Sequence, residues 1–177
     1  MPARGFGLAA LLLLAGVTVA SADENYRVVA AELLPAWWRP APGNLPLRAP
    51  RGAGSESPSG CAAVALRIEP DGRAHQIRII QEGWTPMSPY LHRLLDAELV
   101  RTSRNLRFVP GDKNPGRAPV YTYVIDSLVS FTSPNEVINQ YKRKEVAGFA
   151  KAIAAKCEVP DFVQRVARAT GTPMTVH

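Results

Sequence analysis

Cysteine and histidine are scarce in this chain, which has two cysteines and three histidines among 177 residues. The histidines, His75, His92 and His177, are far apart in sequence, and so are Cys61 and Cys157. A zinc finger and a cysteine-rich scaffold both need ligands or cysteines at close, repeated spacings. The sequence therefore excludes these two classes, and it predicts neither a bound metal nor a cofactor.

The familiar patterns of catalytic residues are also missing. No G-x-S-x-G nucleophile turn occurs. The glycine-containing segment 111–116 includes Pro115 and is not followed by a helical pattern, so it predicts an ordinary turn and not a phosphate loop. Glu69 and Asp71 flank another turn and are better explained by turn chemistry than by acid–base catalysis. The sequence thus predicts a protein that is not an enzyme.

Long apolar runs are limited to the N-terminus. A basic start at Arg4 is followed by an apolar run from Leu8 to Ala20 and by the small residues of Ala20-Ser21-Ala22. This is the pattern of a secretory signal peptide, and it predicts that residues 1–22 are removed after Ala22. A retained membrane anchor is the alternative, but the run is shorter than the roughly 20 apolar residues that span a bilayer.

Basic residues exceed acidic ones, with 21 Lys and Arg against 15 Asp and Glu and a pI near 9.7. An excess of this sign favours anionic partners without choosing among nucleic acid, lipid and cell-wall polymer. Because an exported protein does not meet nucleic acid, we expect no nucleic-acid partner. Peripheral contact with a membrane or with the cell wall stays open.

Proline is frequent, and six of the 16 prolines fall within residues 23–58. Proline favours extended backbone, so the composition predicts a semi-stiff linker over residues 23–58. Trp37 and Trp38 are unusual in a spacer. Because large aromatic rings gain free energy from burial, we expect them to dock on the following domain rather than to anchor a partner.

The folded core is predicted to begin near residue 59 with a β-hairpin. Apolar residues occupy the even positions of 62–68, which is the period of a strand, and Pro70-Asp71-Gly72 turns the chain into a second strand over about 74–81. A helix over about Pro89–Arg104 follows, with Ser88 as its N-cap. A long strand at about 120–132, rich in aromatic and β-branched residues, completes a domain over 59–132.

The remaining residues, 133–177, predict a helical extension. Ser133-Pro134 begins a helix that we expect to reach about Cys157, and a shorter helix follows Val159-Pro160-Asp161 and ends at Gly171. The predicted fold class is therefore α+β. It has a small antiparallel sheet with strand-strand-helix-strand order, and the C-terminal helical extension is added to it.

The two cysteines indicate how this extension is attached. Cys61, Ala63 and Ala65 share one face of the first strand, and such small residues allow a helix to approach closely. Cys157 lies on the apolar stripe of the extension helix. Because cysteines of exported proteins tend to be paired, we predict a Cys61–Cys157 disulfide. Two separate buried thiols are the alternative.

Three linked pieces of the chain resemble the C-terminal domain of the TonB family of periplasmic energy transducers. They are the strand and PDG turn of Ile68–Arg73, the helix end and RF-x-P sequence of Leu99–Pro110, and the alternating strand Val120–Phe131. The resemblance covers roughly residues 59–132. One departure is Leu106, which stands where the family usually has an aromatic residue.

The resemblance implies a periplasmic protein-binding module and a mode of binding. In this family, an extended peptide of the partner adds to the edge of the sheet, and main-chain hydrogen bonds supply the affinity. If this mode of binding is carried over to the present chain, the final strand forms the edge. The resemblance then implies these partner-binding residues: Tyr121, Thr122, Tyr123, Val124, Ile125 and Asp126. The partner would be a protein or peptide, such as an outer-membrane receptor in energy-coupled transport. The alternative is a structural or regulatory cell-envelope protein that reuses the fold without energy transduction.

Overall fold

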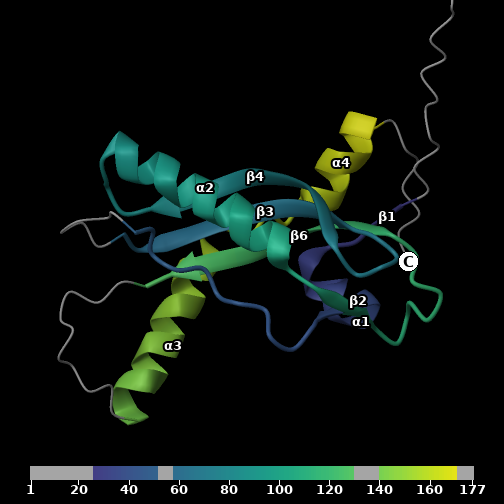
Figure 1. The fold of residues 1–177 in the computed structure, drawn as a ribbon, viewed down its shortest axis with the longest axis horizontal. Coiled ribbons are helices and arrows are strands. Elements are labelled where there is room, and N and C mark those ends of the chain that lie inside the picture. The colour runs from purple at the N-terminus through teal and green to yellow at the C-terminus, as the bar shows by residue number, and fades with distance from the viewer. Residues whose placement is uncertain (1–25, 52–57, 130–139, 171–177) are drawn as a thin grey trace, which may run out of the picture.

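The structure is a computed structural model that describes residues 26–51, 58–129 and 140–170 (Figure 1). The elements in chain order are β1 (Arg27–Val28), the 3-10 helix η1 (Ala31–Leu33), α1 (Leu34–Trp37), β2 (Trp38–Pro40), β3 (Gly60–Ile68), β4 (Ala74–Trp84), α2 (Pro89–Asn105), β5 (Phe108–Pro110), β6 (Val120–Leu128), α3 (Gln140–Ala155) and α4 (Phe162–Thr170). The predicted signal peptide lies outside the described residues. Among those that are described, no helix combines the length and the apolar character needed to cross a membrane.

The main sheet has four strands in the order β1-β6-β3-β4. β3 is central and pairs antiparallel with both β4 and β6. β1 adds a short parallel pair to the outer side of β6. A second, two-stranded sheet joins β2 to β5. The α+β class and the strand-strand-helix-strand order of the central part confirm the fold predicted from the sequence.

The predicted hairpin between β3 and β4 is present, and its turn has the expected chemistry. The backbone N–H of Arg73 donates to Asp71 Oδ1 at 2.9 Å, and the N–H of Gly72 donates to the Glu69 carbonyl at 2.8 Å. Gly72 has φ +78, and a Cβ there would lie 2.1 Å from the Phe108 carbonyl oxygen. Both the positive φ and this close approach require glycine.

α2 covers part of one face of the sheet, as Figure 1 shows. Its N-cap is Ser88, whose Oγ accepts a hydrogen bond from the N–H of Leu91 at 3.3 Å. Leu91, Leu95 and Leu99 recur at helical spacing and are at most 1% exposed. The helix predicted over Pro89–Arg104 is therefore confirmed to within one residue, because the N-cap and the leucine spacing both mark it locally.

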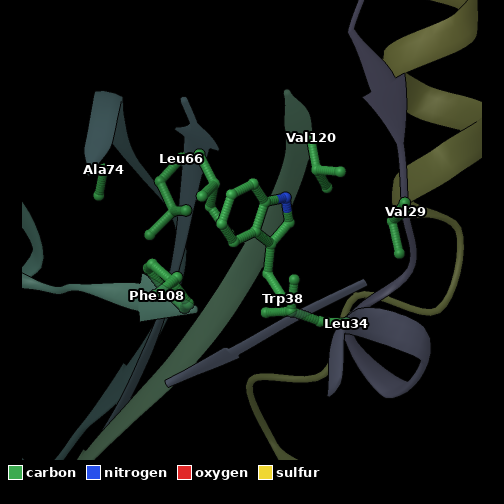
Figure 2. Packing of buried hydrophobic residues seen from close by; sticks show 8 residues of the cluster. Val29, Leu34, Trp38, Leu66, Ala74, Phe108 and Val120 are labelled. Atoms are coloured by element: carbon green, nitrogen blue, oxygen red, sulfur yellow. The ribbon is translucent and has the colours of Figure 1, made fainter. Parts of the chain in front are cut away.

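The described part of the predicted linker, residues 26–51, is part of the folded domain, which corrects the expectation of a spacer. Trp38 is 1% exposed and packs with residues from four other strands and from α1, and Figure 2 shows its indole between Leu66, Phe108 and Val120. Its Nε1 donates to the Ala118 carbonyl at 3.2 Å. Burial of this ring outweighs the tendency of proline-rich sequence to stay extended and solvated. The expected docking of the two tryptophans is observed, because Trp37 also packs partly buried against this cluster.

α4 and the C-terminal end of α3 pack on the opposite face of the sheet, whereas the rest of α3 projects away from it (Figure 1). Cys61, Ala63 and Ala65 of β3 point to this side and pack in one cluster with Ile153, Cys157 and Phe162 of the extension. The described parts of both predicted extension helices are present, whereas the start predicted at Ser133 and the residues 130–132 of the final strand lie outside the described residues. The sheet thus packs against α2 on one side and against α4 and the end of α3 on the other.

Candidate functional site

β6 is the strand that the sequence analysis assigns to partner binding, and it lies second in the sheet. β3 pairs with its inner side without interruption, from Ile68 opposite Val120 to Gly60 opposite Leu128. On the outer side, β1 pairs with the first two residues of β6. The N–H of Val29 donates to the Tyr121 carbonyl at 2.9 Å. The first residue of the predicted site, Tyr121, is therefore already paired within the chain.

The rest of the outer side of β6 follows from strand geometry. The N–H and C=O of one residue point to the same side of a strand, and the side alternates along the chain. Because the Tyr121 carbonyl points outward to Val29, the backbone groups of Tyr123, Ile125 and Ser127 also point outward. Among the described residues, no strand pairs with these three.

The side chains of β6 alternate between the two layers. Tyr121, Tyr123 and Ile125 point to the layer of α3 and α4. The Phe162 ring of α4 lies 5.7 Å from the Tyr121 ring and 5.0 Å from the Tyr123 ring, measured between centroids. The N–H of Val159 donates to the Tyr123 hydroxyl at 3.1 Å. These tyrosines therefore hold the extension in place and offer a partner little side-chain surface.

Thr122, Val124 and Asp126 point to the layer of α2. Thr122 is fully buried, and Val124 packs partly buried beside Leu95 and Leu99. Asp126 Oδ2 is buried and has no hydrogen-bond partner among the described residues. Burial raises the pKa of the Asp126 carboxyl above its ordinary value, because the charged form loses hydration there. Of the six predicted residues, most are thus engaged by the fold through their side chains, and what remains without a strand partner among the described residues is the outward backbone of β6 after Tyr121.

β4, the strand at the opposite end of the sheet, has an irregular edge. Its pairing with β3 shifts register twice, between Ala63 and Val64 and again between Ala65 and Arg67. Gln76, near the second shift, has φ 50, which is unusual for a residue other than glycine. Bulges twist an edge strand and make it a poor template for another strand. The outward edge of β6 is therefore more regular than the outward edge of β4.

The Cys61–Cys157 disulfide is present and joins β3 to the residues after α3. The Cα atoms of the two cysteines are 6.1 Å apart, and both side chains are fully buried. Gly83 of β4 lies opposite Cys61, and a Cβ at this position would lie 3.8 Å from the Cys157 sulfur. A Cβ there would be in ordinary van der Waals contact with the disulfide, which therefore packs directly against the neighbouring strand.

A cluster of titratable side chains, Glu82, His92 and Asp96, lies where β4 meets α2. His92 Nε2 is 3.2 Å from Glu82 Oε2, and His92 Nδ1 is 3.3 Å from Asp96 Oδ2. Burial raises the pKa of the Glu82 carboxyl, and the neighbouring Asp96 carboxyl raises it further. The sequence does not single out this cluster when its three histidines are compared only with one another, because they are far apart. The four-residue spacing of His92 and Asp96 on one helix was the available signal, and only the fold adds Glu82.

The fold defines an α+β domain whose sheet lies between two helical layers. Among solved structures, the chain is similar to the Pseudomonas aeruginosa TonB C-terminal domain determined by solution NMR. The identity is 17%, the TM-score is 0.41, and the match covers 60% of this chain and 97% of that chain. No family model and no curated protein matches the chain.

Proposed function

We propose that this chain is a periplasmic protein-binding module whose partner adds an extended strand to the outer edge of β6. The observation that supports the proposal most directly is the row of outward backbone groups at Tyr123, Ile125 and Ser127, which no strand among the described residues pairs. Each such residue offers one donor and one acceptor, and an added strand satisfies both.

The inner pairing of β6 favours this edge over that of β4. Nine consecutive residues of β6 pair with β3 without a register shift, so the outward groups keep a regular spacing. β1 already pairs in parallel with the start of the same edge. The outer edge of β6 therefore already pairs with β1 of the same chain. A partner strand would pair with the following residues of β6, beyond the point where β1 ends.

The sequence resemblance to TonB C-terminal domains extends the proposal to the kind of partner. It suggests a periplasm-facing segment of an outer-membrane receptor, in a chain that is exported by residues 1–22. Affinity in this mode comes mainly from main-chain hydrogen bonds, so the partner needs an extended segment without proline at the pairing positions.

The test uses peptides selected from a random phage-displayed library on the purified, tag-free chain. The best peptide is titrated calorimetrically into the wild type, Ile125→Pro and Ile125→Ala. Both variants lose the isoleucine side chain, but only proline removes the outward N–H. We expect Ile125→Ala to bind within a few-fold of the wild type and Ile125→Pro to lose binding. Both variants must keep the wild-type far-UV circular dichroism spectrum.

Amide hydrogen exchange adds a second measurement. The amides of Tyr123, Ile125 and Ser127 should exchange more slowly when the peptide is bound, whereas amides on the outer edge of β4 should not change. Equal affinity of Ile125→Pro and Ile125→Ala, or protection confined to β4, would show that strand addition at β6 is wrong.

A structural role in the cell envelope is the second candidate. The layer of α3 and α4, which the disulfide fixes to the sheet, favours this role because strand addition does not need such a layer. A basic chain would then associate with anionic wall polymer. Retention on isolated wall sacculi at low salt and release at high salt would support this role, and absence of retention would exclude it.

A further inference from the structure

The cluster of Glu82, His92 and Asp96 has no part in strand addition, yet it gathers three side chains of the kinds that bind metal ions. One ligand atom from each residue lies within 4.8 Å of the other two. In a tetrahedral Zn²⁺ site with bonds of about 2.0–2.2 Å, the ligand atoms are roughly 3.3 Å apart. The two contacts of His92 come from different ring nitrogens, Nε2 to Glu82 Oε2 at 3.2 Å and Nδ1 to Asp96 Oδ2 at 3.3 Å. Each nitrogen thus has this spacing to one carboxylate, and the other carboxylate has to turn toward the same nitrogen to share an ion.

Two rigid elements hold the three side chains. His92 and Asp96 lie one turn apart on the same side of α2, and Glu82 comes from the end of β4 that precedes this helix. α2 is fixed against the sheet by its buried leucines. Because the three ligand atoms lie within 4.8 Å of one another, binding of one ion requires the side chains to rotate until a single imidazole nitrogen faces both carboxylates.

The charges of the cluster favour a cation. Two carboxylates face one imidazole, which supplies at most one positive charge. Asp96 Oδ1 is buried and has no hydrogen-bond partner among the described residues. Buried carboxylate oxygens are costly unless they are paired or coordinate a metal. A divalent ion would neutralise both carboxylates and would leave the imidazole neutral.

The cluster is also open to solvent on one side. The side chain of His92 is 41% exposed, that of Glu82 is 25% exposed and that of Asp96 is 36% exposed. A hydrated ion can therefore reach the three ligands, and water can complete its coordination.

We propose that Glu82, His92 and Asp96 bind a divalent first-row transition-metal ion, with Zn²⁺ as a representative. One imidazole nitrogen and two carboxylate oxygens form a donor set that Zn²⁺ accepts, and the three protein ligands leave a position for water. The ion would link β4 to α2. The site is independent of strand addition, and its test does not need a binding partner.

The experiment titrates ZnCl₂ into the chelator-treated, tag-free chain by calorimetry, with the disulfide intact. The variants are His92→Ala and Glu82→Gln, and the second keeps the shape of the side chain if the first disturbs the fold. His75→Ala is the matched control, because His75 is an exposed histidine of the same strand, β4, outside the cluster. Thermal unfolding with and without Zn²⁺ gives a second measure, since a ligand that binds only the folded state raises its stability.

We expect the wild type and His75→Ala to bind one Zn²⁺ per chain with equal affinity. Loss of a supporting side chain beside a metal commonly costs about 10–100-fold in affinity, so loss of a ligand should cost at least that much in His92→Ala and Glu82→Gln. Zn²⁺ should raise the melting temperature of the wild type and not that of these two variants. Absence of binding at millimolar Zn²⁺ would overturn the proposal and leave an ion-pair triad. Undiminished binding by both variants would overturn it as well.

Discussion

Substitution of Trp38 is the sharpest test of whether the proline-rich N-terminal segment is part of the folded domain. The ring is 1% exposed and contacts a cluster that includes Leu66, Phe108 and Val120. Truncation of a buried tryptophan to alanine removes its transfer free energy and leaves a cavity, which together cost about 3–5 kcal/mol. We expect Trp38→Ala to lower the free energy of unfolding by that amount.

The hydrogen bond of Trp38 adds little to this figure. Its Nε1 donates to the Ala118 carbonyl, but the same carbonyl also accepts from Asn114 Nδ2 at 3.0 Å. The carbonyl therefore keeps a partner in the variant, and no buried polar group is left without one. Nearly all of the expected loss comes from the ring, so Trp38→Phe should retain most of the stability.

Trp37 provides the matched control, because it is adjacent in sequence but only partly buried. Its ring lies under the Arg27 guanidinium, 4.9 Å from the centroid, a contact worth about 0.5–1 kcal/mol at an accessible site. Trp37→Ala should therefore cost much less than Trp38→Ala. Urea unfolding followed by far-UV circular dichroism measures the free energy of unfolding of both variants, because this signal comes mainly from the backbone and not from the replaced tryptophan. No loss in Trp38→Ala would refute the buried position of this segment and restore the linker interpretation. Equal losses in the two variants would refute the difference in burial between the two rings.

Three further predictions concern the carboxyl of β6, the disulfide and a close backbone contact. Burial raises the pKa of the Asp126 carboxyl in the folded chain, so folding takes up a proton and the stability of the wild type falls as the pH rises through that pKa. Asp126→Asn should therefore be more stable than the wild type at pH 7 in urea unfolding. This difference in stability should vanish below the ordinary pKa range of aspartate. Replacement of Cys61 and Cys157 by serine opens a loop with a sequence separation of 96 and should cost about 4–5 kcal/mol, and mass-based thiol counting of the denatured, unreduced wild type should find no free thiol. Gly111→Ala should destabilise by about 1–3 kcal/mol because its Cβ would lie 2.4 Å from an α1 carbonyl oxygen, whereas Gly116→Ala, with open space around it, should be neutral in the same assay.

The central elements could be predicted from the sequence because their signals are local. Pro70-Asp71-Gly72 encodes its own turn, and Ser88 caps a helix whose leucines repeat at the helical period. The α+β class follows from these elements. The pairing of Cys61 with Cys157 depended on one more step, the placement of small residues on one face of β3.

The parts that were not predicted depend on contacts between distant residues. β1 has two residues, and its pairing with Tyr121 is set by tertiary packing and not by any local pattern. The composition of residues 23–58 indicates extended chain, and it is the burial of a single ring, Trp38, that overrides this tendency. Glu82 reaches His92 only because α2 folds back along β4.

The covalent link between Cys61 and Cys157 also determines how the molecule responds to mechanical tension. A force that pulls on the two ends of the chain passes from one cysteine directly to the other through the sulfur atoms. β4, α2 and β6 lie within the enclosed loop, so the covalent chain does not stretch them, and β6 is loaded only through its pairing with β1 and its contact with α4. Only the segments outside the loop lengthen under such a pull. A partner paired with the edge of β6 would instead transmit its force to the enclosed strands through the hydrogen bonds between β6 and β3.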